Sequence, residues 1–465
     1  APALDFDSSG RLLCSQLPGL TLRTRIRFIV DRSVRFELSD HDEVRRLLKH
    51  WRAELSPQLE GSEEEDFVSG FEDDEALLDL ASDAPIIRLV NHQFARALDL
   101  NASYIHYEPN EHSLNVRCRV DGIMTRIEKL PVKIHTAVAS RLKLMAKLDI
   151  GEKRLPQDGR IDYQLGSNQL DMRVSTLPGV HGESVVLRIL DRSDTAVELT
   201  ALGMPQSILI DYQSVITQPH GMILITGPTG SGKTTTLYAA LNAIVGPEKK
   251  VITTEDPVEY NLEGVNQIPV DHKVGMSFAM GLRAILRHDP DVVMIGEIRD
   301  LETAQAATQA SLTGHLVLST LHTNDAASAA TRLIDMGVEP FLVSSTLSGV
   351  MAQRLVRVIC PICKTEMNPK EAGLPKNMKW PEGDKVYTGS GCRACRNSGY
   401  KGRTGLYELL TMNEELGERI IDRVASSELV RIGRANGMRL LSEDGWFKVR
   451  NGVTTPEEVL RVTAA

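Results

Sequence analysis

The sequence predicts an α/β protein in which a core with a parallel sheet is preceded by α+β domains and followed by helices. Three observations favour this class. From residue 220 onward, short segments that are apolar on both faces alternate with helical segments, as parallel strands between helix layers do. A glycine-rich loop follows the first of these strands and leads into a helix. The composition, 42% hydrophobic and 25% charged over 465 residues, is ordinary for a globular chain of about three domains.

The first 58 residues predict a small α/β domain. RTRIRFIV alternates around Ile26 and Phe28 as a strand does, and Ser39 precedes a helical pattern. Residues 59–79 hold ten acidic residues and neither Lys nor Arg, so we interpret residues 59–80 as a flexible, self-repelling linker.

The ten acids of this segment exceed the net charge of −9, so the remainder of the chain carries a net charge of +1. The rest of the chain is close to neutral. Because a protein that holds nucleic acid through its phosphates more often carries a basic excess, we expect no direct nucleic-acid binding.

Residues 81–199 predict a second α+β domain. Ser82, Asp83 and Pro85 are typical of a helix start, and strand-like SLNVRCRVDG follows. After another helical segment, residues 160–190 are rich in strand patterns.

Residues 200–355 carry the core pattern. Four segments predict buried parallel strands: GMILIT, KVITT, DVVMIGE and HLVLST. ETAQAATQASL (302–312) and FLVSSTLSGVMAQRL (341–355) are the clearest helical segments between and after them.

The glycine-rich loop matches GxxxxGK[ST], the phosphate-binding pattern, between the strand GMILIT and the helix TTTLYAALNAIV. Backbone N–H groups of such a loop surround an anion, while Lys233 reaches the β and γ phosphates and the Thr234 hydroxyl ligates Mg²⁺. We therefore expect ATP and Mg²⁺ to bind at eight residues: Gly227, Pro228, Thr229, Gly230, Ser231, Gly232, Lys233 and Thr234.

Carboxylates at the ends of neighbouring strands are candidates for the chemistry. Glu297 ends DVVMIGE, although glycine occupies position 296, where many phosphate-loop enzymes have an aspartate. Glu255 and Asp256 follow VITT. One carboxylate would help hold Mg²⁺ through water and another would orient or deprotonate the attacking water, and the sequence leaves open which does which. His322, at the end of HLVLST, is a candidate donor to the γ-phosphate.

The cysteines predict a structural metal site. Four of the six lie in two CxxC pairs separated by 28 residues, namely Cys360, Cys363, Cys392 and Cys395. Four thiolates complete a tetrahedral Zn²⁺ site and leave no open position for catalysis.

Taken together, GPTGSGKTTTLY, VITTEDPVEY, GEIRD and GHLVLSTLHT closely resemble the secretion ATPases that drive type II secretion and type IV pilus assembly. The resemblance extends from about residue 81 to the C-terminus through LPQDGRI, STLPG, CPICK and GRTGLYELL, and is strongest to the type II assembly ATPases. It implies a RecA-like ATPase core at 200–355, a PAS-like domain at 81–199, a tetracysteine zinc module at 356–402 and a helical region at 403–465.

The resemblance also implies roles for particular residues. Glu255 corresponds to the family's Asp box, Glu297 to its atypical Walker B motif, and His315 and His322 to its His box. Arginines of the second domain contact phosphate in this family, and two arginines stand at the matching positions, Arg173 and Arg188. A guanidinium offers fixed, permanently charged donors to developing phosphoryl charge. Arg299 in GEIRD is a weaker candidate.

The family resemblance implies a homo-hexamer that couples ATP hydrolysis to pseudopilus assembly and protein export. It implies two partners at the inner membrane, the cytoplasmic domain of the L protein, which residues 1–58 would contact, and the platform F protein. A type IV pilus extension ATPase remains the alternative within the class. Position 104 departs from the family, because Tyr104 stands where SDIH has an acid.

No apolar run approaches the ~18 residues that a membrane span requires. The first residues, APALDFDSSG, lack the basic start and apolar stretch of a signal peptide. We therefore expect a cytoplasmic protein that attaches to the inner membrane through its partners.

Overall fold

The computed structural model describes residues 84–463, except 166–167, 192–196, 376–379 and 382–383, together with three short strands near the start of the chain. These strands, β1 (Asp5–Phe6), β2 (Arg11–Cys14) and β3 (Arg35–Leu38), form one sheet. The chain divides into two compact units, Ala1–Glu72 and Asp73–Ala465. The strand expected around Ile26, the helix expected after Ser39 and the linker expected at 59–80 lie outside the described residues.

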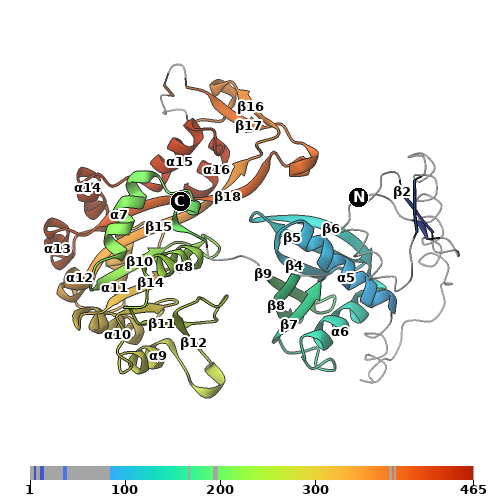
Figure 1. The fold of residues 1–465 in the computed structure, drawn as a ribbon, viewed down its shortest axis with the longest axis horizontal. Helices are drawn as coiled ribbons and strands as arrows, with labels where there is room; N and C mark the ends of the chain where they lie inside the picture. Colours follow the sequence, from blue (N-terminus) through green and yellow to red (C-terminus); the bar gives the residue numbers. More distant parts are fainter. Residues whose placement is uncertain are drawn as a thin grey trace. The chain divides into compact units, whose positions relative to one another are not determined.

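The second unit begins with a six-stranded antiparallel sheet in the order β6-β5-β4-β9-β8-β7. Its elements are α5 (Ala84–Asp99), β4 (Ala102–Pro109), β5 (Ser113–Val120), β6 (Ile123–Pro131), α6 (His135–Met145), β7 (Gln157–Leu165), β8 (Asn168–Leu177) and β9 (Ser184–Asp191). Helices α5 and α6 cover one face of the sheet, where Phe94 and Leu142 are fully buried (Figure 1). Because side chains alternate across a strand, polar residues of β8 and β9 lie on the other face.

A seven-stranded sheet follows, in the order β12-β11-β13-β14-β10-β15-β18, with every pair parallel except β15 and β18 (Figure 1). Its elements are α7 (Gln206–Ile216), β10 (Gly221–Thr226), α8 (Lys233–Ile244), β11 (Val251–Glu255), β12 (Val265–Pro269), α9 (Phe278–Ile285), β13 (Val292–Ile295), α10 (Leu301–Leu312), β14 (Leu316–Leu321), α11 (Ala327–Asp335), α12 (Pro340–Thr346), β15 (Leu347–Ile359) and β18 (Tyr400–Thr411). Strands β10, β11, β13 and β14 confirm the four strands predicted from apolar runs.

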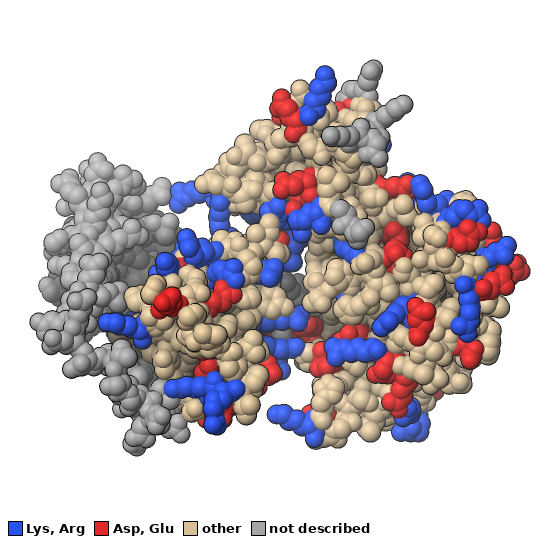
Figure 2. All heavy atoms as spheres, turned by 180° about the vertical axis from the view of Figure 1, so that it is seen from behind, with Lys and Arg blue, Asp and Glu red and all other residues tan. Residues whose placement is uncertain are grey.

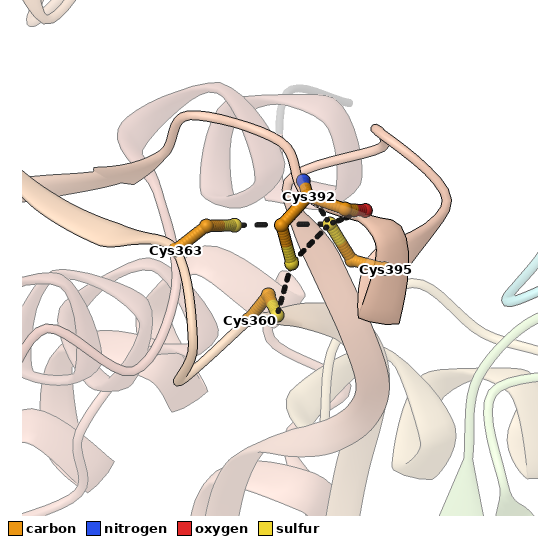
Figure 3. A group of neighbouring side chains, drawn as sticks. All are labelled: Cys360, Cys363, Cys392 and Cys395. Atoms are coloured by element: carbon orange, nitrogen blue, oxygen red, sulfur yellow. Dashed lines mark hydrogen bonds between the residues drawn. The ribbon is translucent and has the colours of Figure 1, made fainter. Parts of the chain in front are cut away.

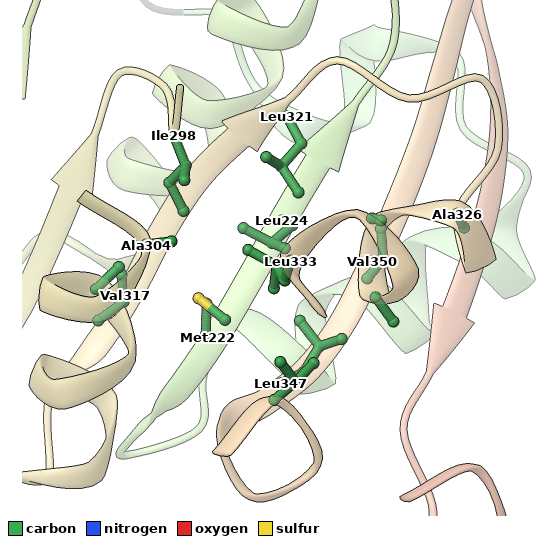
Figure 4. Close-up of a cluster of buried hydrophobic side chains, with 14 of the residues drawn as sticks. Met222, Leu224, Ile298, Ala304, Val317, Leu321, Ala326, Leu333, Leu347 and Val350 are labelled. Atoms are coloured by element: carbon green, nitrogen blue, oxygen red, sulfur yellow. The ribbon is translucent and has the colours of Figure 1, made fainter. Parts of the chain in front are cut away.

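Two hydrophobic clusters enclose this sheet. One lies between the sheet and helices α9 to α12, and Figure 4 shows Leu224 of β10, Leu333 of α11 and Val350 of β15 meeting within it. The other lies against α7 and α8 and includes Tyr212 and Leu237. Residues of β10 are buried on both faces, as the apolar run predicts for a central parallel strand.

The helix expected over 341–355 is wrong beyond Thr346. Helix α12 ends there, and Leu347 begins the long strand β15, which pairs with β10 on one side and β18 on the other. An apolar run has no periodicity that separates a buried helix from a buried strand, so the neighbouring strands decide its conformation.

Strand β15 leads into the cysteine-containing segment, and β18 returns from it. Positions 355 and 402, where we expected domain boundaries, therefore fall inside strands of the main sheet. The segment contains β16 (Lys364–Met367) and β17 (Val386–Gly389). Four helices complete the chain, as expected for a helical C-terminal tail: α13 (Glu414–Ile421), α14 (Ser426–Ala435), α15 (Leu441–Arg450) and α16 (Pro456–Thr463).

Candidate nucleotide site

The phosphate-binding loop lies between β10 and α8, as predicted. Gly227 and Gly232 have φ values of 151° and 88°, which residues other than glycine rarely adopt. A Cβ on Gly227 would stand 2.5 Å from the carbonyl oxygen of Gln353, and one on Gly232 would stand 2.8 Å from the Gln353 amide nitrogen. Strand β15 therefore packs so closely against the loop that glycine is needed at both positions.

The loop is suited to an anion. No side chain caps the amino end of α8, so its first N–H groups can bind a ligand. The Ser231 hydroxyl is buried and has no hydrogen-bond partner in the described part of the chain. Thr234 is exposed at the mouth of the loop, where its hydroxyl can reach a metal ion. These features fit a phosphate group with Mg²⁺.

The Lys233 side chain contacts the backbone of the loop. Its Nζ donates to the carbonyl oxygens of Gly227 at 2.7 Å and Pro228 at 3.2 Å. The pKa of Lys233 is lowered to about 8, mainly by burial, while Glu297 opposes this shift and Arg354 adds to it. The lysine thus lies in the electrostatic field of both an acid and a second cation.

Glu297 and His322 meet at the carboxyl edge of the sheet, because their parallel strands β13 and β14 end side by side. The Nε2 of His322 lies 3.4 Å from one carboxylate oxygen of Glu297, and Arg299 donates to the other at 2.5 Å. Burial alone would raise the pKa of Glu297, but Arg299 and His322 outweigh burial and hold this pKa below its usual value. Glu297 is therefore an ionised carboxylate near the loop.

The loop that carries His322 is tied to the phosphate loop. The backbone N–H of Thr323 donates to the hydroxyl oxygen of Thr226 at 2.8 Å, directly before Gly227. His315, in contrast, lies at the opposite end of β14, where its carbonyl oxygen accepts from the N–H of Gly221. The two histidines therefore do not share one site.

Glu255 ends β11 at the same edge, but its carboxylate is already occupied. It is buried and accepts hydrogen bonds from Tyr238, from Thr253 at 2.6 Å and from Gln267 at 3.0 Å. The neighbouring Asp256 lies 3.3 Å from the Nε2 of His272. Of the two candidate acids, Glu297 has the carboxylate that interacts with Lys233.

Arg173 and Arg188 lie directly opposite each other on β8 and β9. Both approach Glu259, Arg188 at 2.9 Å and Arg173 at 3.9 Å. Burial lowers the pKa of Arg173, Glu259 opposes this shift, and Arg188 adds to it. We did not single out Glu259 from the sequence, although it is the last acid of VITTEDPVEY. In this arrangement its carboxylate is the anion between the two predicted arginines.

The four predicted metal ligands converge. Cys360 and Cys363 lie between β15 and β16, while Cys392 directly precedes the short helix η5 (Arg393–Cys395) and Cys395 is its last residue. Figure 3 shows their sulfur atoms turned toward one another, and all four lie within 4.8 Å. Three Sγ–Sγ distances are 3.7, 3.7 and 3.9 Å. Tetrahedral zinc with Zn–S bonds of about 2.3 Å requires about 3.8 Å between sulfurs, so the group fits this metal.

Charge on one face of the described residues is mixed. Figure 2 shows Lys and Arg interspersed with Asp and Glu on the face in view. Among the described residues, no helix is both long enough and apolar enough to cross a bilayer.

The parallel sheet, the phosphate loop and the carboxylate at its edge define a phosphate-loop nucleotide-binding protein. The model of the family "Type II/IV secretion system protein" matches residues 79–461, and the chain belongs to this family. The structural expectation of an α/β core with preceding α+β elements, a four-cysteine cluster and a helical tail is confirmed.

Relatives in bacteria agree with the family. The chain is 49% identical over 410 residues to the "Type II secretion system ATPase E" of Vibrio cholerae, covering 87% of this chain and 81% of the relative. It is 46% identical over 463 residues to the "Type II secretion system protein E" of Aeromonas hydrophila, covering 97% and 92%.

Solved structures share the fold. The "ATPase DotB" of Legionella pneumophila matches with a TM-score of 0.60 at 22% identity, over 81% of this chain and 95% of that one. The "Pilus Retraction Motor PilT", solved with ADP, matches with a TM-score of 0.53 at 24% identity, over 81% and 97%.

Proposed function

We propose that this chain is the ATPase of a type II secretion system. The observation that carries the proposal is the grouping of Lys233, Glu297 and His322 around the phosphate loop, in a chain whose relatives bear the names of type II secretion proteins. These names favour type II secretion over type IV pilus extension. The mixed charge on the face that Figure 2 shows gives no support to a nucleic-acid motor.

The chemistry is attack of a water oxygen on the γ-phosphorus, which forms a new P–O bond, breaks the bond from the γ-phosphorus to the oxygen that bridges the β and γ phosphates, and releases ADP and inorganic phosphate. Loop N–H groups and Lys233 hold the β and γ phosphates, and His322 donates to the γ-phosphate. Glu297 orients the water or accepts its proton, with Glu255 as the alternative. Bound Mg²⁺ would be held by Thr234 and, through water, by one of these acids, and it would neutralise phosphate charge.

The assembly is proposed as a hexamer in which Arg173 and Arg188 complete a nucleotide pocket. Their positions opposite one another support this role, because two facing cations are stabilised by an anion between them. Closure on ATP would exchange the Glu259 carboxylate for phosphate and move the second domain, residues 81–199, against the core, residues 200–355. This motion would drive pseudopilus assembly, with the L protein contacting residues 1–58, the F protein as the platform, and attachment to the inner membrane through both partners.

The cysteine module, residues 356–402, is proposed to hold one Zn²⁺ through Cys360, Cys363, Cys392 and Cys395. Its role is structural, because four thiolates fill the coordination sphere. Together with the linker at 59–80 and the helical region at 403–465, this gives six segments along the chain.

Lys233→Ala is the direct test of the enzymatic proposal. The loop backbone persists, but the cation at the phosphates is lost, so ATP hydrolysis should fall to background while the thermal midpoint stays near that of the unaltered protein. Lys249→Ala, at an exposed position in the turn after α8, is the matched control and should hydrolyse ATP normally. Turnover by Lys233→Ala at the unaltered rate would refute the proposed site.

A further inference from the structure

Strand β15 runs parallel to β10, beside the phosphate loop. Thr226, the last residue of β10, pairs in register with Ala352. Gln353 and Arg354 therefore follow at the level where the chain leaves β10 and enters the loop. The sequence predicted no role for Gln353 or Arg354, because the pattern of residues 341–355 was interpreted as a helix.

Gln353 fixes the position of β15 against the loop. Its side-chain oxygen accepts a hydrogen bond of 2.8 Å from Thr236 of α8, and both residues are buried. Its backbone carbonyl oxygen lies so close to Gly227 that the Cβ of any larger residue at this position would collide with it. The next residue, Arg354, is thus held beside the loop by a rigid contact.

Arg354 is a buried cation beside the phosphate loop. Its side chain is 7% exposed, and it donates to three uncharged acceptors: the Asn324 carbonyl at 2.9 Å, the Asn324 side-chain oxygen at 3.3 Å and the Gln353 carbonyl at 3.2 Å. Among the described residues, its guanidinium forms no ion pair with a carboxylate. Burial lowers the pKa of Arg354, although Glu408 and Asp325 act against this shift from a distance.

The guanidinium faces the loop. A Cβ built on Gly227 would lie 3.1 Å from one of its terminal nitrogens, and its charge acts on Lys233. Two cations in one partly buried place repel each other, and an unpaired buried charge lowers stability. Such an arrangement is expected where an anion from outside completes the site.

We propose that Arg354 binds the polyphosphate chain of the nucleotide from the β15 side, as a second phosphate-binding cation beside Lys233. The inference rests on the proposed ATPase function. It differs from the role of Arg173 and Arg188, because Arg354 lies on the same sheet as the loop and needs no domain closure. A guanidinium suits the position, since its fixed fork can keep the Asn324 contact while donating to phosphate.

The experiment compares Arg354→Gln with Arg357→Gln in the full chain. Arg357 lies on the same strand but pairs with the buried Glu458 at 2.8 Å, so it is the matched control. Thermal midpoints are measured without nucleotide and with Mg-ATP or Mg-ADP, and dissociation constants with a fluorescent ATP analogue.

Arg354→Gln should melt no lower than the unaltered protein without nucleotide, because an unpaired buried charge has been removed. Its affinity for ATP should fall about tenfold or more, as loss of a charge-assisted hydrogen bond implies. Arg357→Gln should show the opposite pattern, a lower midpoint and unchanged affinity, because the buried Glu458 loses one of its two arginine partners and keeps only Arg461. Arg354→Met, which keeps aliphatic length without charge, gives the same readout if the glutamine variant does not fold.

A folded Arg354 variant with unchanged nucleotide affinity and a lower thermal midpoint would overturn the inference. Arg354 would then have only a structural role, through its hydrogen bonds to Asn324. Failure of the unaltered protein to bind ATP would instead refute the proposed function, and the inference with it. ATP binding by the unaltered chain therefore distinguishes failure of the inference from failure of the proposed function.

Discussion

The protonation state of Lys233 should make ATP binding at the phosphate loop depend on pH. Burial is the main cause that lowers the pKa of Lys233 to about 8. Phosphate stabilises the ammonium form, so the bound state holds this proton to higher pH than the free state. As pH rises above 8, binding must therefore take up a proton, and affinity for ATP should fall by up to about tenfold per pH unit.

The measurement is the dissociation constant of ATP between pH 7 and 10, with proton uptake followed by calorimetry in buffers of different ionisation enthalpy. Lys233→Arg is the control, because a guanidinium remains charged over this range and should remove the pH dependence. A variant with the same profile as the unaltered protein would assign the titration to another group.

Glu297 and Glu255 differ in their surroundings, and substitution by glutamine should separate their roles. Glu297→Gln should bind ATP but hydrolyse it about 100-fold more slowly or worse, because the carboxylate nearest the loop is lost. Glu255→Gln would present an amide to groups that donate to the native carboxylate, Tyr238 among them. We expect a loss of stability of about 1–3 kcal/mol from this mismatch.

Parallel ATPase and thermal-unfolding assays check both expectations. If Glu297→Gln turns over at the unaltered rate, the water-activating role belongs to Glu255. In that case Tyr238 and Gln267 would have to release the Glu255 carboxylate when nucleotide binds.

Among the elements, the strands β15 and β18 depend on the cysteine cluster, because they lead into it and out of it. A structural zinc contributes on the order of 10 kcal/mol or more of apparent binding free energy. Chelation, or Cys→Ser at any of the four positions, should therefore destabilise residues 360–402 and the adjoining strand ends.

Elemental analysis and hydrogen exchange measure this effect. We expect about one zinc per folded chain, consistent with a four-thiolate site. Cys118→Ser is the control, because Cys118 is buried in the six-stranded sheet and should not alter zinc content. Less than about half a zinc per well-folded chain would exclude the proposed four-thiolate site.

At the scale of the whole molecule, the pair Arg173 and Arg188 links the six-stranded sheet to Glu259 of the core. If these arginines complete a nucleotide pocket between subunits, specific activity should rise with protein concentration. Arg173→Ala or Arg188→Ala should lower turnover far more than ATP binding, because the guanidinium acts mainly on charge that develops during reaction.

Mixing Lys233→Ala chains with Arg188→Ala chains tests whether the arginine acts on a neighbouring subunit. Some mixed interfaces would then regain a complete pocket, and activity should exceed that of either variant alone. Arg119→Ala, an arginine of the same sheet with no proposed role, is the control in place of Arg188→Ala and should retain activity by itself. Activity that does not change with concentration, together with no recovery on mixing, would restrict closure to a single chain.

The sequence alone determined the features that depend on local pattern. The loop around Lys233, the strands before and beside it and the two CxxC pairs were predicted, because backbone geometry and metal chemistry restrict which residues can occupy such short segments. Tertiary structure decided the rest. It made residues 347–355 a strand because β10 and β18 lie on either side, and it placed Arg354 beside the loop. It also placed three hydrogen-bond donors around the Glu255 carboxylate and positioned Glu259 to form an ion pair with Arg188. These outcomes depend on contacts between residues far apart in the chain, which the pattern of any one segment does not contain.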